Sequence, residues 1–254
     1  MQSPQRTPQS NRRFAFAAIV GVGLFVAGMA TLSLRYDTYE MRSGVMAPAL
    51  EQGEVALVQP PHGAPTRGDV ILIDGTYWPN VPPGTVFAMR VAAVGGDRVM
   101  CCDSDGRIVL NGRPLAESYA SGASETFGRF DIVVPAGRMF LLGDDRDRAR
   151  DSRELLFPRQ RRTGDSLDNS TIAGDVTHAT FATSASRGRV LTVISPPWRL
   201  RVVTPAGAAS PHYYALAAVA LGAVIFLAGA LPLAARAMHR LSPALGKRRA
   251  SPSW

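Results

Sequence analysis

Two long apolar runs limit how this chain can fold. Residues 14–34 (FAFAAIVGVGLFVAGMATLSL) and residues 213–235 (YYALAAVALGAVIFLAGALPLAA) contain no charged side chain. As helices rising about 1.5 Å per residue, stretches of this length reach roughly 31–35 Å, which is enough to cross the hydrocarbon core of a bilayer. Two such runs are hard to bury in a soluble protein of 254 residues, so we expect one N-terminal and one C-terminal transmembrane helix.

The first run has a competing interpretation as a cleaved signal peptide, because Arg12 and Arg13 precede it as a basic leader region would. The apolar core of a signal peptide is about 7–15 residues long, and this run is longer. We therefore expect a retained anchor. The second run opens with Tyr213 and Tyr214, which suit a membrane–water interface, and it ends before Arg236.

The net charge of +8 comes from the chain's two ends rather than from its central part. Residues 36–212 carry 19 arginines and all 20 acidic residues, which sum to −1. This distribution argues against a basic nucleic-acid-binding domain. Because basic residues favour the cytoplasmic side, we expect both tails in the cytoplasm and the central part outside, in a protein of the plasma or inner membrane. The surplus basic residues are Arg6, Arg12, Arg13, Arg35, Arg236, Arg240, Lys247, Arg248 and Arg249.

Short apolar or alternating segments bounded by turn residues fill the central part, and this pattern predicts an all-β domain without internal repeats. Asn111-Gly112 predicts a tight hairpin turn. The expected organisation is a basic tail at 1–13, a span at 14–34, a β-domain at 36–205, a span at 213–235 and a basic tail at 236–254. The expected strands are 55–58, 69–73, 86–94, 108–110, 132–134, 139–142 and 172–181.

Four sequence blocks occur in a fixed order within this central part. They read SGVMAPAL at 43–50, RGDVI at 67–71, MRVAAVGGDRV at 89–99 and GDDRDRARDSR at 143–153. Each block alone is compatible with an ordinary turn or a solvated charge run. Together, over about residues 40–182, they resemble the type I signal peptidases, membrane-anchored serine endopeptidases of peptidase family S26 that cut signal peptides from exported proteins. The resemblance implies a signal-peptidase-like β-domain.

The resemblance also implies a catalytic serine–lysine dyad, and this sequence departs from it at three positions. The nucleophile position is Val45, the general-base position is Met89, and the position of the hydroxyl that orients the lysine is Ala149. None of these side chains can attack a carbonyl or accept a proton.

No other residue restores the missing base. The only lysine is Lys247, beyond the second apolar run, and Arg90 stays protonated at any relevant pH. The endoplasmic-reticulum and archaeal relatives use a histidine as the base, but none occupies position 89. The histidines are His62, His178, His212 and His239.

The other family positions are retained. By resemblance, Ser43 helps form the oxyanion site, while Met46 and Pro48 shape the peptide groove. We expect Asp144, Arg146, Asp151 and Arg153 to form a buried charge network, because such groups are tolerated only with all their partners. The site-framing residues implied by the resemblance are Asp69, Arg90, Gly96, Asp97, Gly143, Asp144, Arg146, Asp151, Ser152 and Arg153.

We therefore predict a pseudoenzyme that binds a signal peptide or a membrane-protein partner without cleaving it, with no cofactor, metal or nucleic acid. One alternative is an active endopeptidase that uses Ser43 with Asp145 or Asp151 as base, although a carboxylate of ordinary pKa is a poor base for serine. Another is a non-enzymatic assembly subunit whose spans do the recognising. The adjacent Cys101 and Cys102 are compatible with two ordinary thiols or with a disulfide.

Overall fold

The computed structural model describes residues 9–78, 81–157, 176–203 and 211–246. They belong to two compact units, one formed by residues 36–206 and the other by the terminal segments 1–35 and 207–254, and each is described separately below. Most of the expected N-terminal tail and the end of the C-terminal tail lie outside the described residues, as do positions 204 and 205 at the expected domain boundary.

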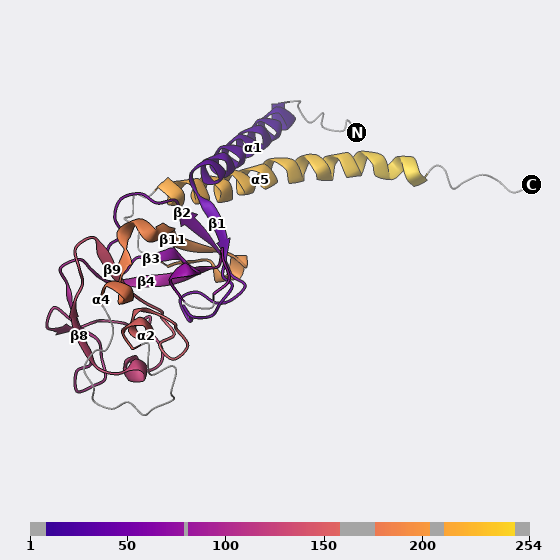
Figure 1. Ribbon diagram of the computed structural model, residues 1–254. Helices are drawn as coiled ribbons and strands as arrows, with labels where there is room; N and C mark the ends of the chain where they lie inside the picture. Colours follow the sequence, from indigo (N-terminus) through magenta and orange to yellow (C-terminus); the bar gives the residue numbers. More distant parts are fainter. Residues whose placement is uncertain (1–8, 79–80, 158–175, 204–210, 247–254) are drawn as a thin grey trace, which may run out of the picture. The chain divides into compact units, whose positions relative to one another are not determined.

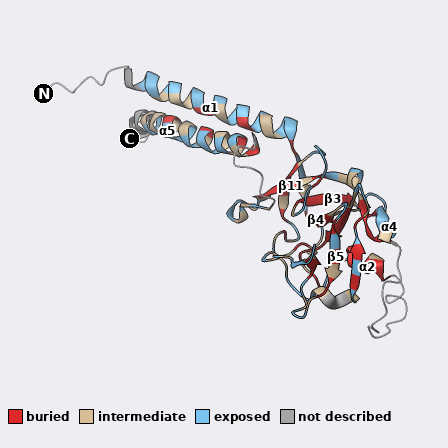
Figure 2. Ribbon diagram, turned by 90° about the vertical axis from the view of Figure 1, so that its left-hand side faces the viewer, coloured by how far each residue is buried: buried red, intermediate tan, exposed pale blue. Residues whose placement is uncertain are grey.

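The terminal unit is a pair of long helices, α1 (Gln9–Arg35) and α5 (Pro211–Gly246). Within them, Asn11–Arg35 and His212–Met238 are long and apolar enough to cross a membrane. Figure 2 shows that most of their surface is exposed, as expected for helices that face lipid rather than a protein core. The unit therefore fits a membrane protein, as predicted.

Glycines let the two helices approach closely and fix their antiparallel pairing. A β-carbon on Gly21 would lie 2.8 Å from the carbonyl oxygen of Gly222, and one on Gly222 would lie 2.7 Å from that of Gly21. Gly28 and Gly229 meet the partner backbone in the same way on either side of this contact. Small residues at these points allow backbone-to-backbone packing, which is the usual basis of helix association in lipid.

The second unit contains two antiparallel sheets, whose strands are visible in Figure 1. The larger sheet has the order β1-β2-β11-β3-β4-β9-β10, and β12 also pairs with β11. Its strands are β1 (Asp37–Glu40), β2 (Val55–Gln59), β3 (Val70–Asp74), β4 (Val86–Val94), β9 (Arg138–Leu142), β10 (Phe181–Ala182), β11 (Ser186–Ser195) and β12 (Arg201–Val202).

The smaller sheet has the order β7-β6-β5-β8. Its strands are β5 (Arg98–Cys101), β6 (Val109–Leu110), β7 (Arg113–Pro114) and β8 (Phe130–Val133). Asn111 and Gly112 join β6 to β7 with φ values of 51° and 78°, so the predicted tight hairpin is present. Cys101, the last residue of β5, is joined to the following residue, Cys102, by a disulfide.

Short helices connect the strands. The α-helices are α2 (Ser152–Leu156) and α4 (Val176–Ala179), and the 3-10 turns are η1 (Gly75–Tyr77), η2 (Ser124–Phe127), η3 (Thr183–Ala185) and η4 (Pro197–Arg199). The prediction of a mostly β-sheet body between two apolar helices is thus confirmed.

Two parts of the strand prediction need correction. The strand expected at 172–181 is wrong over 176–179, which form α4, and only Phe181–Ala182 pair as a strand; 172–175 lie outside the described residues. The second error is that four strands, β1, β5, β11 and β12, were not predicted. The strands β3 and β4 contribute many side chains to the core, and Figure 2 shows both strands largely buried. One face of this sheet packs Val70, Leu72 and Ala88, and the other packs Ile71 and Met89.

Candidate functional site

The three positions that depart from the family pattern come together around Gly143. Val45, in the turn that precedes β2, packs against the apolar cluster that contains Met89. Leu142 pairs with Arg90 across β9 and β4, so Gly143 comes opposite Met89 one residue further on. A β-carbon on Gly143 would clash with the β-carbon of Ala149 and would lie 2.8 Å from the Val45 carbonyl oxygen. Glycine is therefore the residue that this junction accommodates.

This junction contains apolar contacts at the positions where the sequence resemblance implies reacting groups. Met89 and Ala149 are buried, and Val45 is half-buried. The Asp145 N–H donates to the Val45 carbonyl at 3.0 Å, which holds the turn against the segment after β9. The side chains of the three residues offer neither a nucleophile nor a proton acceptor.

The three residues that the resemblance assigns to the oxyanion site and the peptide groove lie close together in the segment at 43–48. Met46 is buried in the core, Pro48 is exposed and Ser43 is half-buried. The turn is held by backbone hydrogen bonds such as the one from the Leu50 N–H to the Met46 carbonyl at 2.8 Å. Ser121, from the neighbouring segment, donates its hydroxyl to the Ala47 carbonyl at 3.4 Å.

The carboxylates considered as bases for Ser43 are engaged elsewhere. Asp151 accepts hydrogen bonds from the Arg153 Nη2 at 2.8 Å and from the Gly143 N–H at 3.1 Å, and it also caps α2. Asp145 accepts from the Arg148 N–H at 3.2 Å. Within the described part of the chain, no hydrogen bond joins Ser43 to either carboxylate.

Arg90 and Asp144 form the first buried ion pair that frames the junction. Arg90 Nε and Nη2 donate to the two Asp144 carboxylate oxygens at 2.8 and 2.5 Å, and Nη1 donates to the Gly68 carbonyl at 3.0 Å. The guanidinium also lies 4.0 Å from the centre of the Tyr119 ring. Burial raises the pKa of the Asp144 carboxyl, although the Arg90 hydrogen bond acts in the opposite direction.

Arg146 forms the second ion pair, with Glu117. Its Nη1 also donates to the Ser124 hydroxyl at 2.9 Å, and its Nε donates to the Gly143 carbonyl at 2.9 Å. Burial, together with the nearby Glu117 charge, raises the pKa of Tyr119 to about 12, so its hydroxyl stays protonated at neutral pH.

Arg153 connects these pairs. It is fully buried against Asp151, and its Nη2 donates to the Arg146 carbonyl at 2.9 Å. Its Nη1 approaches the Ser124 carbonyl at 3.3 Å. The expected buried network therefore exists, but Asp144 pairs with Arg90 and Arg146 pairs with Glu117. The sequence did not predict Glu117, Tyr119 and Ser124 as members of this network, because they belong to none of the four blocks. The available signal was Arg146 itself, because a buried arginine requires an acidic partner somewhere in the chain.

The remaining framework residues hold turns and strand ends. Asp97 accepts from the Val94 N–H at 2.9 Å and from Arg67 Nε at 2.7 Å, while Gly96 supplies a φ of 91° in the same turn. Asp69 accepts from the Thr66 N–H at 2.7 Å, and the Ser152 hydroxyl accepts from the Leu141 N–H at 2.9 Å. Each of these contacts stabilises a turn or the end of a strand.

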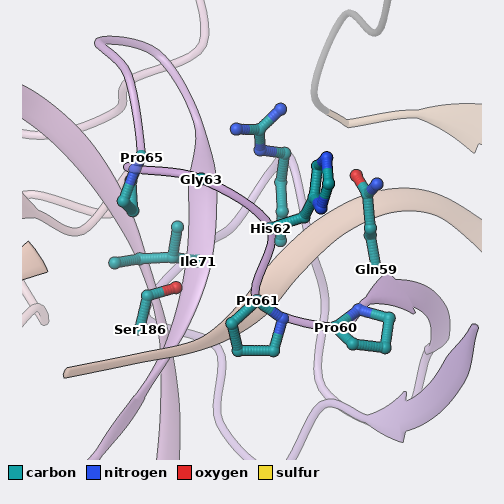
Figure 3. A pocket seen from close by; sticks show the side chains of 9 residues that line it. Gln59, Pro60, Pro61, His62, Gly63, Pro65, Ile71 and Ser186 are labelled. Atoms are coloured by element: carbon teal, nitrogen blue, oxygen red, sulfur yellow. The ribbon is translucent and has the colours of Figure 1, made fainter. Parts of the chain in front are cut away.

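Two surface hollows lie outside this junction. One, of about 370 Å³, is lined by Arg107, Glu117 and Ser124, among others. The other, shown in Figure 3, is lined by residues that include His62, Ser186 and Arg189. In this view the His62 ring and the Ser186 hydroxyl do not point toward each other, so they do not form a substitute serine–histidine pair. In the described ranges, no three His, Cys, Asp or Glu residues are grouped to hold a metal.

Comparisons with known proteins agree with the motif blocks. A family model described as signal peptidase, peptidase S26, matches residues 12–179. Signal peptidase I of Bacillus licheniformis is 26% identical over 168 residues, which cover 61% of this chain and 86% of that protein. The probable signal peptidase I-1 of Synechocystis sp. is 32% identical over 154 residues, which cover 57% of this chain and 77% of that protein.

Among solved structures, a signal peptidase I from Enterococcus faecalis aligns with 51% of this chain and 98% of its own. The sequence identity is 21% and the TM-score is 0.34.

Proposed function

The chain belongs to the signal peptidase family, peptidase S26, and from that premise we propose that it is a membrane-anchored member that binds an extended peptide without cleaving it. The observation that carries this proposal is the apolar set Val45, Met89 and Ala149 at the positions where the family resemblance puts the reacting groups. Serine-type hydrolysis needs a hydroxyl and a base within hydrogen-bonding reach of it. Loss of one catalytic group already removes most of the rate of hydrolysis. Later apolar substitutions of the other groups therefore lower that rate little further.

The geometry gives little support to Ser43 as a substitute nucleophile. A substitute base would have to lie about 2.6–3.2 Å from the hydroxyl. Asp151 is held by Arg153 and the Gly143 N–H, and Asp145 is held by the Arg148 N–H. Redirecting Asp151 toward Ser43 would leave the fully buried Arg153 without its counter-charge.

We place the protein in the plasma or inner membrane with α1 and α5 as spans. The basic residues beyond the spans favour cytoplasmic termini, which puts the β-sheet unit on the extracytoplasmic side. This is the compartment in which signal peptides emerge. The peptide would add as a strand at a sheet edge next to the turn that carries Ser43 and Pro48, because main-chain pairing recognises extended peptides of varied sequence.

Restoring the reacting groups tests the loss of catalysis. The unaltered full-length chain, in detergent or vesicles, should leave a signal-peptide-bearing precursor intact. The triple variant Val45→Ser, Met89→Lys and Ala149→Ser should release some mature product at the signal-peptide junction. The matched control is Val45→Ala with the same two other changes, which supplies the lysine but no nucleophile. Cleavage by the unaltered chain that disappears in Ser43→Ala would show instead that Ser43 is an active nucleophile.

Photocrosslinking tests binding independently of cleavage. A precursor carrying a photoreactive residue in its signal peptide should crosslink to the turn at residues 43–50. Crosslinks confined to α1 or α5 would favour an assembly subunit that recognises its partner through the spans.

A further inference from the structure

A tyrosine in the first strand of the larger sheet connects two strands that do not pair with each other. The Tyr39 hydroxyl donates to the Val86 carbonyl at 2.8 Å. Tyr39 lies in β1 and Val86 begins β4, and the strands β2, β11 and β3 stand between them in the pairing order. The side chains of both residues pack against the apolar cluster that contains Ala88. The sheet therefore curls so that β1 and β4 approach each other across this cluster.

The first half of β4 has an open edge on the side away from β3. The Gly75 N–H donates to the Thr85 carbonyl at 2.7 Å, one position before β4 begins. Because bonded and non-bonded pairs alternate along antiparallel strands, Val86 and Ala88 turn their N–H and C=O groups away from β3. On that side β9 pairs with β4 only over 90–94, so within the described ranges no strand pairs with Val86 or Ala88 there.

β1 also has an open edge. The Met41 N–H donates to the Glu54 carbonyl at 2.8 Å, directly after the paired part of β1 and β2. By the same alternation, Thr38 and Glu40 turn their N–H and C=O groups away from β2. β1 is the end strand of this sheet in the part of the chain that the structure describes. Open edges of this kind bind extended peptides through main-chain hydrogen bonds.

The Tyr39 contact sets how far apart the two open edges lie. A tyrosine side chain and one hydrogen bond together extend about 9 Å, which is about twice the 4.8 Å spacing of neighbouring strands. A single extended chain between β1 and β4 would therefore lie at pairing distance from both. The Val86 carbonyl, which such a chain would use as an acceptor, is already bonded to the Tyr39 hydroxyl.

We propose that Tyr39 is a latch, whose hydrogen bond to Val86 closes the space between β1 and β4 until an extended peptide displaces the hydroxyl and pairs with both open edges. β1 leads directly into the turn that carries Ser43, so the latch lies beside that turn. The proposal rests on the peptide-binding function proposed above and names how that site is regulated. A hydrogen bond of ordinary net strength corresponds to a change of about two- to tenfold in affinity.

Tyr39→Phe tests the latch, because it removes the hydroxyl and keeps the ring. The full-length chain in detergent is titrated with a fluorescently labelled synthetic signal peptide, and fluorescence anisotropy measures the affinity. Tyr39→Phe should bind this peptide about two- to tenfold more tightly than the unaltered chain. Tyr77→Phe is the matched control and should leave the affinity unchanged, because the Tyr77 ring packs against Phe181 away from β1. Thermal unfolding checks that all three chains are folded.

Hydrogen exchange then locates the bound peptide. Added peptide should slow amide exchange over residues 37–40 and 86–88, where the open edges lie. β8 is the matched control, because it is the end strand of the smaller sheet and also pairs on one side only. Its exchange should not change when the peptide is added.

The outcomes separate the latch from the peptide-binding function. Equal affinity in the unaltered chain and Tyr39→Phe, or weaker binding by the variant, overturns the latch and leaves peptide binding in place. Protection confined to β8 also overturns the latch. If both folded chains fail to bind the peptide, the peptide-binding function and the latch are overturned together.

Discussion

Two adjacent regions of the β-sheet unit have opposite chemistry. Around Gly143, the positions to which the sequence resemblance assigns reacting groups hold the apolar residues Val45, Met89 and Ala149, of which Met89 and Ala149 are buried. Directly beside them, Arg90, Arg146 and Arg153 are buried against acidic partners with their hydrogen bonds satisfied.

The difference follows from how much each kind of substitution lowers the stability of the fold. An apolar residue in place of a buried serine or lysine removes a group that has to be desolvated, so it costs little stability. Removal of one member of a buried ion pair leaves an uncompensated charge, which costs much more. Substitutions in the buried ionic framework should therefore destabilise the fold more than apolar substitutions at the positions beside it. The following variants test this contrast, from the largest expected effect to the smallest.

Arg153→Leu should have the largest effect. It leaves the fully buried Asp151 without its counter-charge and removes the hydrogen bonds to the Arg146 and Ser124 carbonyls. We expect a loss of about 3–5 kcal/mol in the free energy of unfolding. Chemical denaturation of the purified chain measures it. Exposed Arg148→Leu is the control and should change little. A similar small change in both variants would mean that the buried pair does not stabilise the fold.

Met89→Lys should destabilise the fold in a way that depends on pH. Burial would lower the pKa of the new amine, and a shift of about two units costs about 3 kcal/mol at neutral pH. The penalty is complete below the folded-state pKa and disappears as the pH rises toward the unfolded value of about 10.4. Thermal unfolding at about pH 7 and about pH 9.5 should therefore show the variant recovering relative to the unaltered chain. A pH-independent difference would indicate that position 89 is hydrated.

Gly143→Ala tests how tightly the two regions meet. The new methyl group would clash with Ala149 and with the Val45 carbonyl. Overpacking of this kind costs about 1–3 kcal/mol, and denaturation midpoints would show it. Gly44→Ala is the control and should be better tolerated, because a β-carbon at this position would have no atom within 4 Å. Gly137→Ala is unsuitable as a control, because the φ of Gly137 is 71° and alanine would be strained there. Equal loss in Gly44→Ala would contradict a specific steric effect at position 143.

Asp97→Asn should have the smallest effect. Burial opposes ionisation of this carboxyl, but the hydrogen bonds from Arg67, the Val94 N–H and Asn111 lower its pKa overall. A lowered pKa contributes stability above the unfolded value of about 3.9, and this contribution is lost as the pH falls through the folded-state pKa. The variant should be about 1 kcal/mol less stable at neutral pH. Its difference from the unaltered chain should shrink below about pH 4, and a constant difference would exclude this linkage.

Local patterns in the sequence predicted the structural features that depend on residues close together in the chain. The two uncharged runs became α1 and α5, and Asn111-Gly112 became the expected hairpin because both residues tolerate positive φ. The features that were not predicted depend on residues far apart in the sequence. Nothing near Ser186–Ser195 signals that this strand enters the sheet between β2 and β3, and nothing near Glu117 signals that it neutralises Arg146.

The placement of β11 has a consequence for how the chain is made. Its neighbours β2 and β3 end at Gln59 and Asp74, but β11 ends only at Ser195. At about 5–20 residues per second, synthesis takes roughly 7–30 s to pass from Gln59 to Ser195. During that interval β2 and β3 lack their common partner and expose unpaired edges. Until this last long strand is made, sixteen residues before α5 begins, the two edges stay available for pairing with another chain.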